Sequence, residues 1–403
     1  MTINLIIALF ASFITNAVHA QNNTGAVVDL GYARYRAHYN NTLDINEFFG
    51  LPFAAPPIGR LRWKAPQPYS PPYGLNATII DTKRGSQCVQ GYPQWTIADV
   101  PGGMSITGSE DCLVLNIYAP GTITENTKLP VLLVIHGGGY TVGDANLIPP
   151  QALMQHSNNA IITVNIQYRL GAYGFVGSKK FIEEGGAPNV GLQDQRFAMK
   201  WVQEHISAFG GDPAKITIQG GSAGGGSVTS HMTWKGGAEA TPFRAAMPDY
   251  PWWQQYLREE QLAKQFDYLL METNCSSLSC LRDVSEDALK TATQASYTLG
   301  YASGAYGYGH FYYGPYIDGD LIRDLPSREF KAGHFAKIPV MLSREGLEGV
   351  SFSNQSMTTV EEETADMKKH FPYASEDFID KVYQLYPRAA FNSTFWQRQT
   401  WFG

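Results

Sequence analysis

Short apolar runs that end in turn residues mark the middle of this chain. The candidate strands are Val114–Tyr118, Val131–His136, Ile161–Gln167, Lys215–Gln219 and Pro339–Ser343. The apolar run Leu129–Ile135 is typical of a buried strand, whereas Ile216 and Ile218 alternate with polar residues. Apolar residues of Leu192–Ala208 recur instead at helical spacing, and Gly210-Gly211-Asp212-Pro213 ends that segment. Strands that alternate with helices predict an α/β fold with a mostly parallel sheet flanked by helices.

The first twenty residues have the pattern of a secretory signal peptide. Leu5–Ile14 is apolar but too short to span a bilayer, and Val18-His19-Ala20 forms a cleavage site. We therefore expect residues 1–20 to be removed and the protein to be secreted. Glycosylation sequons fit this expectation and begin at Asn22, Asn40, Asn76, Asn274, Asn354 and Asn392.

Composition limits the remaining possibilities. The chain has 403 residues, of which 44% are hydrophobic, so residues 21–403 can form one large domain. The net charge is −6 and no Lys/Arg cluster is present, which argues against nucleic acid or an anionic membrane as partner. No later segment is apolar for long enough to insert stably into a membrane.

Four cysteines in a secreted chain predict two disulfides, for which three pairings are possible. Metal binding is the competing interpretation. The chain has no C-x-x-C motif and no histidine near its cysteines, so we expect neither a metal nor another cofactor.

One motif carries candidate chemistry. The strand that contains Ile216 and Ile218 runs into G-x-S-x-G, with Gly220, Ser222 and Gly224 at the fixed positions. A serine there is typical of a sharp strand-to-helix turn that exposes its hydroxyl. In a chain with 40 glycines the pentapeptide alone equally fits an ordinary glycine-rich loop.

A second motif favours catalysis. The apolar run Leu129–Ile135 ends in His136-Gly137-Gly138-Gly139. Loops of this kind, with the amide that follows the nucleophile, stabilise the oxyanion in lipases and esterases. The donors here are predicted to be Gly138, Gly139 and Ala223.

With these motifs the chain resembles the type-B carboxylesterase/lipase family, which includes cholinesterases and secreted fungal lipases. The resemblance extends from about residue 25 to the end of the chain. Further matching blocks are Phe49–Gly59, Ser109–Leu113, Tyr168–Gly171 and Asn189–Pro213, and Tyr250-Pro251-Trp252-Trp253 is similar to the fungal branch. The resemblance implies the α/β-hydrolase fold.

The same resemblance implies several structural pairs. It selects the disulfides Cys88–Cys112 and Cys275–Cys280 from the three possible pairings. It also implies two structural ion pairs, Arg62–Glu110 and Arg169–Asp194.

The catalytic acid is expected after the strand Pro339–Ser343, because this fold orders its triad as nucleophile, acid, histidine. The alignment of Glu348-Gly349 with the family's motif assigns Glu348, and Glu345 is the alternative. The histidine is harder to find, since His370 is the only one after Glu348 and lies beside Lys368 and Lys369. It has the pattern of a charged surface helix. We therefore expect the family's catalytic histidine segment to be absent from this chain and its C-terminal part to be missing.

The sequence thus predicts a secreted serine hydrolase of carboxylic esters or lipids that acts through an acyl-enzyme on Ser222 and is impaired without its histidine. The alternative is a non-catalytic member of the same fold. Gly221 is a further departure from the family, which usually has Glu or Gln before the serine, where the side chain supports the site.

Overall fold

The computed structural model describes residues 25–72, 74–98, 104–124, 126–346 and 348–391. The expected signal peptide and the sequons at Asn22 and Asn392 lie outside these residues. The strands are β1 (Val27–Asp29), β2 (Arg34–Arg36), β3 (His38–Asn40), β4 (Ile45–Pro52), β5 (Ile79–Asp81), β6 (Val114–Pro120), β7 (Leu129–Ile135), β8 (Ile162–Ile166), β9 (Gly211–Ser222) and β10 (Ala245–Pro251).

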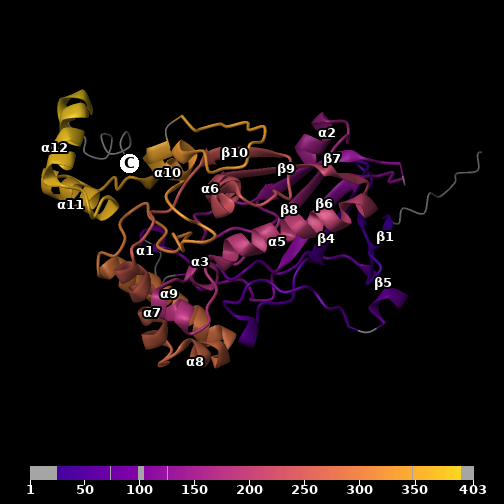
Figure 1. Ribbon diagram of the computed structural model, residues 1–403, viewed down its shortest axis with the longest axis horizontal. Helices are drawn as coiled ribbons and strands as arrows, with labels where there is room; N and C mark the ends of the chain where they lie inside the picture. Colours follow the sequence, from indigo (N-terminus) through magenta and orange to yellow (C-terminus); the bar gives the residue numbers. More distant parts are fainter. Residues whose placement is uncertain (1–24, 73, 99–103, 125, 347, 392–403) are drawn as a thin grey trace, which may run out of the picture.

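Helices follow most of the central strands (Figure 1). The α-helices are α1 (Gln94–Ile97), α2 (Gln151–His156), α3 (Gly171–Phe175), α4 (Lys179–Glu183), α5 (Val190–His205), α6 (Ala223–Met232), α7 (Glu259–Glu272), α8 (Leu278–Asp283), α9 (Glu286–Ala302), α10 (Pro326–Ala332), α11 (Val360–His370) and α12 (Glu376–Leu385). The 3-10 helices are η1 (Gly59–Leu61), η2 (Leu75–Ala77), η3 (Ile206–Phe209), η4 (Trp234–Gly237), η5 (Glu348–Phe352) and η6 (Arg388–Phe391).

A seven-stranded sheet in the order β10-β9-β7-β8-β6-β4-β3 forms the centre of the molecule. β10, β9, β7 and β8 run parallel, whereas β6, β4 and β3 join antiparallel. The predicted strand Pro339–Ser343 continues the parallel half, because Val340 and Ser343 form parallel bridges with β10. Four of the five predicted strands are therefore present, as β6, β7, β8 and β9, whereas Pro339–Ser343 joins the edge of the sheet only through two isolated bridges. The parallel strands end at one common edge. A separate small sheet contains β1, β2 and β5.

The predicted helix Leu192–Ala208 corresponds to α5 followed by η3. Gly210 ends η3 with a φ of 85°, a left-handed conformation that glycine adopts without strain. The buried residues of α5 are not confined to one apolar face. They include the polar side chains Asp194, Gln195 and Arg196. The helix lies along the sheet against β9 (Figure 1).

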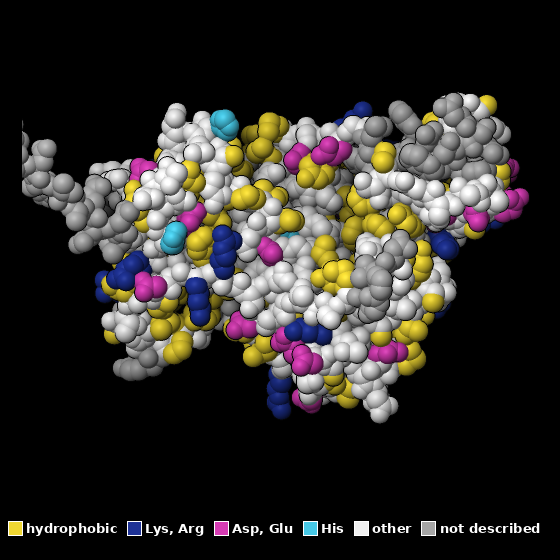
Figure 2. All heavy atoms as spheres, turned by 180° about the vertical axis from the view of Figure 1, so that it is seen from behind, with side chains coloured by type: hydrophobic (Ala, Val, Ile, Leu, Met, Phe, Trp, Pro, Cys, Tyr) yellow, Lys and Arg dark blue, Asp and Glu magenta, His cyan; other side chains and the backbone are white. Residues whose placement is uncertain are grey.

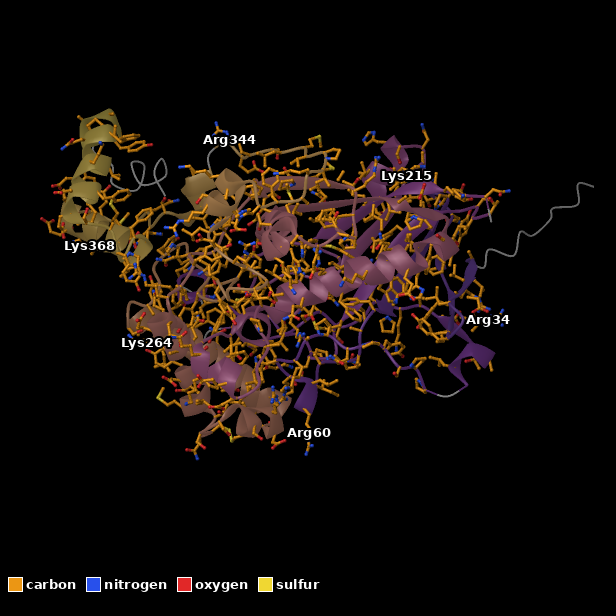
Figure 3. All side chains as sticks on the ribbon, in the orientation of Figure 1. Arg34, Arg60, Lys215, Lys264, Arg344 and Lys368 are labelled. Atoms are coloured by element: carbon orange, nitrogen blue, oxygen red, sulfur yellow. A yellow bond between two sulfur atoms is a disulfide. The ribbon has the colours of Figure 1, made fainter. Side chains whose placement is uncertain are left out.

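Charged side chains are spread over the described surface. Figure 2 shows acidic and basic groups interspersed on the reverse face, and in Figure 3 the labelled Arg and Lys residues lie at separate edges of the molecule. Within the described ranges no helix is long and apolar enough to span a bilayer. The same ranges contain no group of three or more His, Cys, Asp or Glu residues arranged to hold a metal ion.

Candidate active site

Ser222 lies where β9 ends and α6 begins. Its backbone has φ 56° and ψ −124°, a conformation that non-glycine residues rarely adopt. The turn is tight enough to require Gly224, because a Cβ atom there would lie 2.2 Å from the Ile135 carbonyl oxygen. Ser222 itself is only partly buried. The structure thus contains the sharp strand-to-helix turn that the G-x-S-x-G motif predicts.

The glycine loop after β7 lies against this turn, because β7 and β9 are parallel neighbours. A Cβ atom placed on Gly137 would lie 3.2 Å from Ser222 Cβ and 2.7 Å from the Gly221 carbonyl oxygen. Gly138 and Gly139 have φ of 99° and 61°. The Gly138 carbonyl oxygen accepts hydrogen bonds from the Thr141 and Val142 amides, so the loop has a fixed shape beside the serine.

His136 stabilises the base of this loop. Its Nδ1 lies 2.8 Å from the Gly137 carbonyl oxygen, and its ring stacks on Tyr168 with 4.5 Å between centroids. The Tyr168 hydroxyl donates to the His136 carbonyl oxygen. Burial lowers the pKa of His136 to about 4, so its imidazole is neutral at pH 7. These contacts give His136 a structural role.

Aromatic side chains form a wall beside the serine. The Trp252 amide donates to the Ser222 carbonyl oxygen, and the Trp252 ring lies 5.2 Å from Phe311. Phe311 covers Gly139, where a Cβ atom would lie 2.0 Å from its ring. Trp95 continues the wall, 5.6 Å from Phe311. These three segments are far apart in the sequence, and only the fold brings them together.

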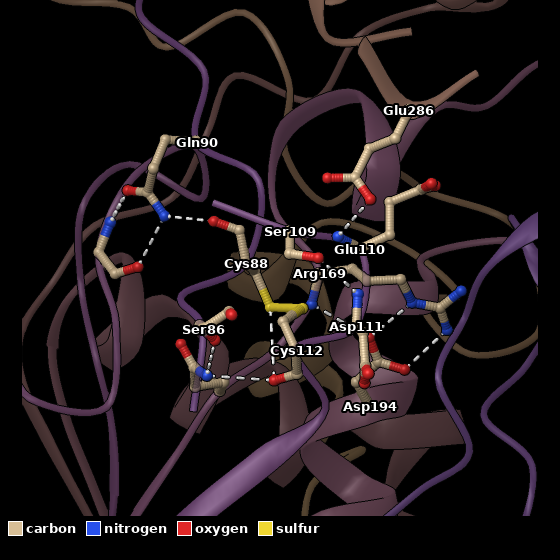
Figure 4. Close-up of a disulfide and its surroundings, with 12 residues drawn as sticks. Ser86, Cys88, Gln90, Ser109, Glu110, Asp111, Cys112, Arg169, Asp194 and Glu286 are labelled. Carbon is tan, nitrogen blue, oxygen red and sulfur yellow. Dashed lines mark hydrogen bonds and ion pairs between the residues drawn. A yellow bond between two sulfur atoms is a disulfide. The ribbon is translucent and has the colours of Figure 1, made fainter. Parts of the chain in front are cut away.

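Two disulfides join the cysteines in the pairing that the resemblance implied. The Cα atoms of Cys88 and Cys112 are 4.9 Å apart, and those of Cys275 and Cys280 are 5.6 Å apart. Figure 4 shows the first disulfide beside Glu110 and the Arg169–Asp194 pair.

Both expected ion pairs are present and buried. Arg62 donates two 2.7 Å hydrogen bonds to Glu110, and Arg169 donates at 2.8 and 2.7 Å to Asp194. A third donor of Arg62 reaches the Val284 carbonyl oxygen at 2.6 Å. The first pair therefore holds the disulfide segment to the end of α8, and the second fixes the loop after β8 to α5.

The candidate acids follow the edge strand beside β10. Ser343 pairs with Asp249, and its carbonyl oxygen accepts from the Tyr250 amide at 3.0 Å. Glu345 follows in an exposed segment. Glu348 begins η5, but its side chain lies outside the described part of the chain.

The histidines are placed differently from what the sequence indicated. His370 is not a surface residue, since its side chain is only 14% exposed. Its Nδ1 lies 2.8 Å from His310 Nε2, and its Nε2 lies 3.3 Å from an Asp366 carboxylate oxygen. Burial, and then the neighbouring His370, lower the pKa of His310 to about 3. Among the residues that the structure describes, no histidine is hydrogen-bonded to Ser222.

Gly221 has a neighbour that the sequence did not predict. A Cβ atom there would lie 2.4 Å from the hydroxyl oxygen of Tyr250, so the phenol occupies the space beside the residue that precedes the serine. In the sequence Tyr250 stands out only as part of the Tyr250-Pro251-Trp252-Trp253 block. No local pattern relates it to Gly221, because the two are joined by strand pairing.

Comparisons with known proteins agree with this geometry. The model of the carboxylesterase family matches residues 27–400. The chain is 34% identical to Lipase 5 of Diutina rugosa and 32% identical to Carboxylesterase patB of Aspergillus clavatus, over 85% and 82% of its length. It spans 66% of the length of each of these relatives. The crystal structure of Aspergillus niger EstA superimposes with a TM-score of 0.80 at 32% identity, covering 94% of this chain and 71% of that one.

Proposed function

The chain belongs to the carboxylesterase family, and from that premise we propose that it is a serine-dependent hydrolase of carboxylic esters. The observation that carries the proposal is Ser222 at a strained turn with the Gly137–Gly139 loop packed against it. Strain of this kind costs on the order of 1–3 kcal/mol and persists where the surrounding structure enforces it. An ordinary glycine-rich loop without a chemical role does not require this backbone strain.

In the proposed reaction the Ser222 hydroxyl attacks the ester carbonyl carbon. The amides of Gly138, Gly139 and Ala223 donate hydrogen bonds to the oxyanion, and the alcohol leaves as the acyl-enzyme forms. Water then releases the carboxylic acid. Glu348 is the proposed acid, with Glu345 as the alternative, and its role is to orient and charge-stabilise an imidazole.

The aromatic wall favours esters with an apolar acyl or alcohol group, including lipids. Phe311 contacts Trp252 and Trp95 edge to face. The group is joined to the site through the Trp252 amide at Ser222 and through Phe311 at Gly139. We also propose that the protein acts outside the cell as a glycoprotein, which its N-terminal segment, sequons and two disulfides support.

The 403-residue chain is proposed to be a slow catalyst. No imidazole is bonded to Ser222 within the described residues, and His370 is instead bonded to His310. In a serine protease, loss of the triad's base costs about 10⁶-fold in kcat. The oxyanion donors and binding alone leave roughly 10³–10⁴-fold acceleration over the uncatalysed reaction.

A fluorophosphonate probe with mass spectrometry tests the proposal. We expect covalent labelling at Ser222, slow compared with ordinary serine hydrolases, and none in Ser222→Ala. Hydrolysis of p-nitrophenyl butyrate by the purified monomer should show the same loss. Labelling at another serine, or ester hydrolysis that survives Ser222→Ala, would refute the assignment.

Within the described residues Ser222 has no bonded histidine, and this also favours a second candidate, a non-catalytic member of the fold. A binding protein of this kind retains apolar ligands at the aromatic wall without covalent chemistry. Saturable ligand binding in a chain whose Ser222 never reacts with the probe, even after prolonged incubation, would favour this candidate.

A further inference from the structure

Tyr250 is the extra residue of a β-bulge beside the nucleophile turn. In the pairing of β10 with β9, Asp249 is opposite Gly221 and Pro251 is opposite Ser222, so Tyr250 has no partner of its own. Its φ is 32°, which is uncommon for a residue with a bulky side chain. Bulges redirect a side chain and occur often beside active sites.

The phenol of Tyr250 points at the turn. A Cβ atom on Gly221 would lie 2.4 Å from Tyr250 Oη and 2.5 Å from Cζ. Glycine is therefore the residue that fits at position 221 while the phenol remains in place. The hydroxyl consequently lies against the residue that directly precedes Ser222.

The same residue also contacts the edge strand that leads to the candidate acids. The Tyr250 amide donates to the Ser343 carbonyl oxygen, and the Ser343 hydroxyl donates to the neighbouring Asp249 carboxylate. Burial raises the pKa of Tyr250, as do the carboxylates of Asp249 and Glu345. The hydroxyl therefore stays protonated at neutral pH and is available as a hydrogen-bond donor.

We infer that Tyr250 is a positioning residue, whose phenol sets the spacing between the nucleophile turn at Gly221 and the acid-bearing segment that starts at Ser343. The inference rests on the proposed function, because it assigns a role beside Ser222. Gly221 and Tyr250 form a matched pair, in which a side chain at one position excludes the ring at the other. The backbone amide of Tyr250 holds Ser343 while its phenol lies against Gly221, so the residue limits the movement of the acid-bearing segment relative to Ser222.

Two sets of variants separate the hydroxyl from the ring. Tyr250→Phe keeps the ring and removes only the donor. Gly221→Ala pushes a methyl group into the phenol, and Gly221→Ala with Tyr250→Ala removes the conflict. Tyr69→Phe is the matched control, since Tyr69 is also partly buried but packs on Tyr32, which is next to β2. The measurements are thermal unfolding and the reaction of Ser222 with the fluorophosphonate probe, resolved into affinity and maximal rate.

For Tyr250→Phe we expect the maximal labelling rate to fall about tenfold, with probe affinity and melting temperature unchanged, because the turn gains room to move where the hydroxyl lay against Gly221 and a small misplacement of the nucleophile slows the reaction. Tyr69→Phe should label at the parent rate. Gly221→Ala should lower the melting temperature in the parent and leave it unchanged in the Tyr250→Ala background.

Labelling of Tyr250→Phe at the parent rate would overturn the inference. The same holds if Gly221→Ala lowers the melting temperature equally in the parent and in the Tyr250→Ala variant. Failure of the proposed function has a different signature. In that case Ser222 of the parent remains unlabelled while the stability coupling between Gly221 and Tyr250 persists. The phenol would then be a packing residue, which also contradicts the inference.

Discussion

At the scale of single residues, the buried ion pair between Arg169 and Asp194 tolerates little substitution. Arg169 and Asp194 are almost completely buried and joined by two hydrogen bonds, so each compensates the desolvation of the other. The pair maintains stability only while both partners are present, since replacing one of them leaves the other as a buried charge without compensation.

Substitution of Asp194 by Asn should therefore lower the free energy of unfolding by about 3–5 kcal/mol, because the Arg169 guanidinium loses its counter-charge inside the protein. Chemical denaturation measures the change. Asp324→Asn is the control, because Asp324 pairs with Arg328 at the surface and should cost less than about 1 kcal/mol. Equal decreases in the free energy of unfolding for the two substitutions would show that the Arg169–Asp194 pair is dispensable.

At the scale of elements, α11 is held to the molecule through polar and aromatic contacts near its C-terminal end. His370 meets His310, its carbonyl oxygen accepts from Gln255, and the following Tyr373 ring lies under Arg258. The disulfides act at the same scale, since each joins two segments of the chain.

Acidification should loosen the His310–His370 contact. The pKa of His310 is lowered to about 3 in the fold, whereas a histidine of the unfolded chain titrates near 6.5. Between these values only the unfolded state binds the proton, so stability is complete above about pH 6.5 and falls as pH drops toward 3. Melting temperatures at pH 7.5, 6.0 and 5.0 should decline less steeply in His310→Asn than in the parent. Exposed His156→Asn should retain the parent's slope.

Removal of the two disulfides should have unequal effects. Cys88–Cys112 closes a separation of 24 residues and Cys275–Cys280 one of 5. The chain-entropy relation gives about 3.5 kcal/mol for the longer loop and about 2 kcal/mol for the shorter. Paired Cys→Ser variants, compared by denaturation under non-reducing conditions, measure both. A larger loss of stability on removal of Cys275–Cys280 would show that loop entropy does not dominate the contribution of these disulfides.

At the scale of the whole molecule, the parallel half of the sheet ends in an apolar edge. Val340, Met341 and Leu342 are 48%, 62% and 66% exposed, on the strand that pairs with β10. An exposed apolar edge strand is a template for pairing with another chain.

We expect the 403-residue chain to self-associate in a concentration-dependent way through this edge. Leu342→Lys should shift the population toward monomer, because a charge on an edge strand opposes pairing. Light scattering coupled to size-exclusion chromatography measures the shift. Leu385→Lys is the control, since Leu385 is 68% exposed but ends helix α12. An equal shift in both variants would indicate general solubility instead of edge pairing.

The sequence by itself determined the local features of this protein. Apolar runs predicted the strands of the central sheet, and glycines at Gly220 and Gly224 predicted the turn at Ser222. These predictions succeeded because backbone conformation and strand burial depend on residues that are close in the chain. The family resemblance supplied the disulfide pairing and the two ion pairs, which composition alone left open.

Only the tertiary structure decided which distant segments meet. It brought Tyr250 against Gly221 through a bulge, covered Gly139 with Phe311, and buried His370 against His310, where the sequence suggested a surface helix. None of these contacts has a local signature, because each joins segments through the register of the sheet or the packing of a helix end. The turn at Ser222 is therefore encoded locally, whereas its surroundings are set by pairings that exist only in the fold.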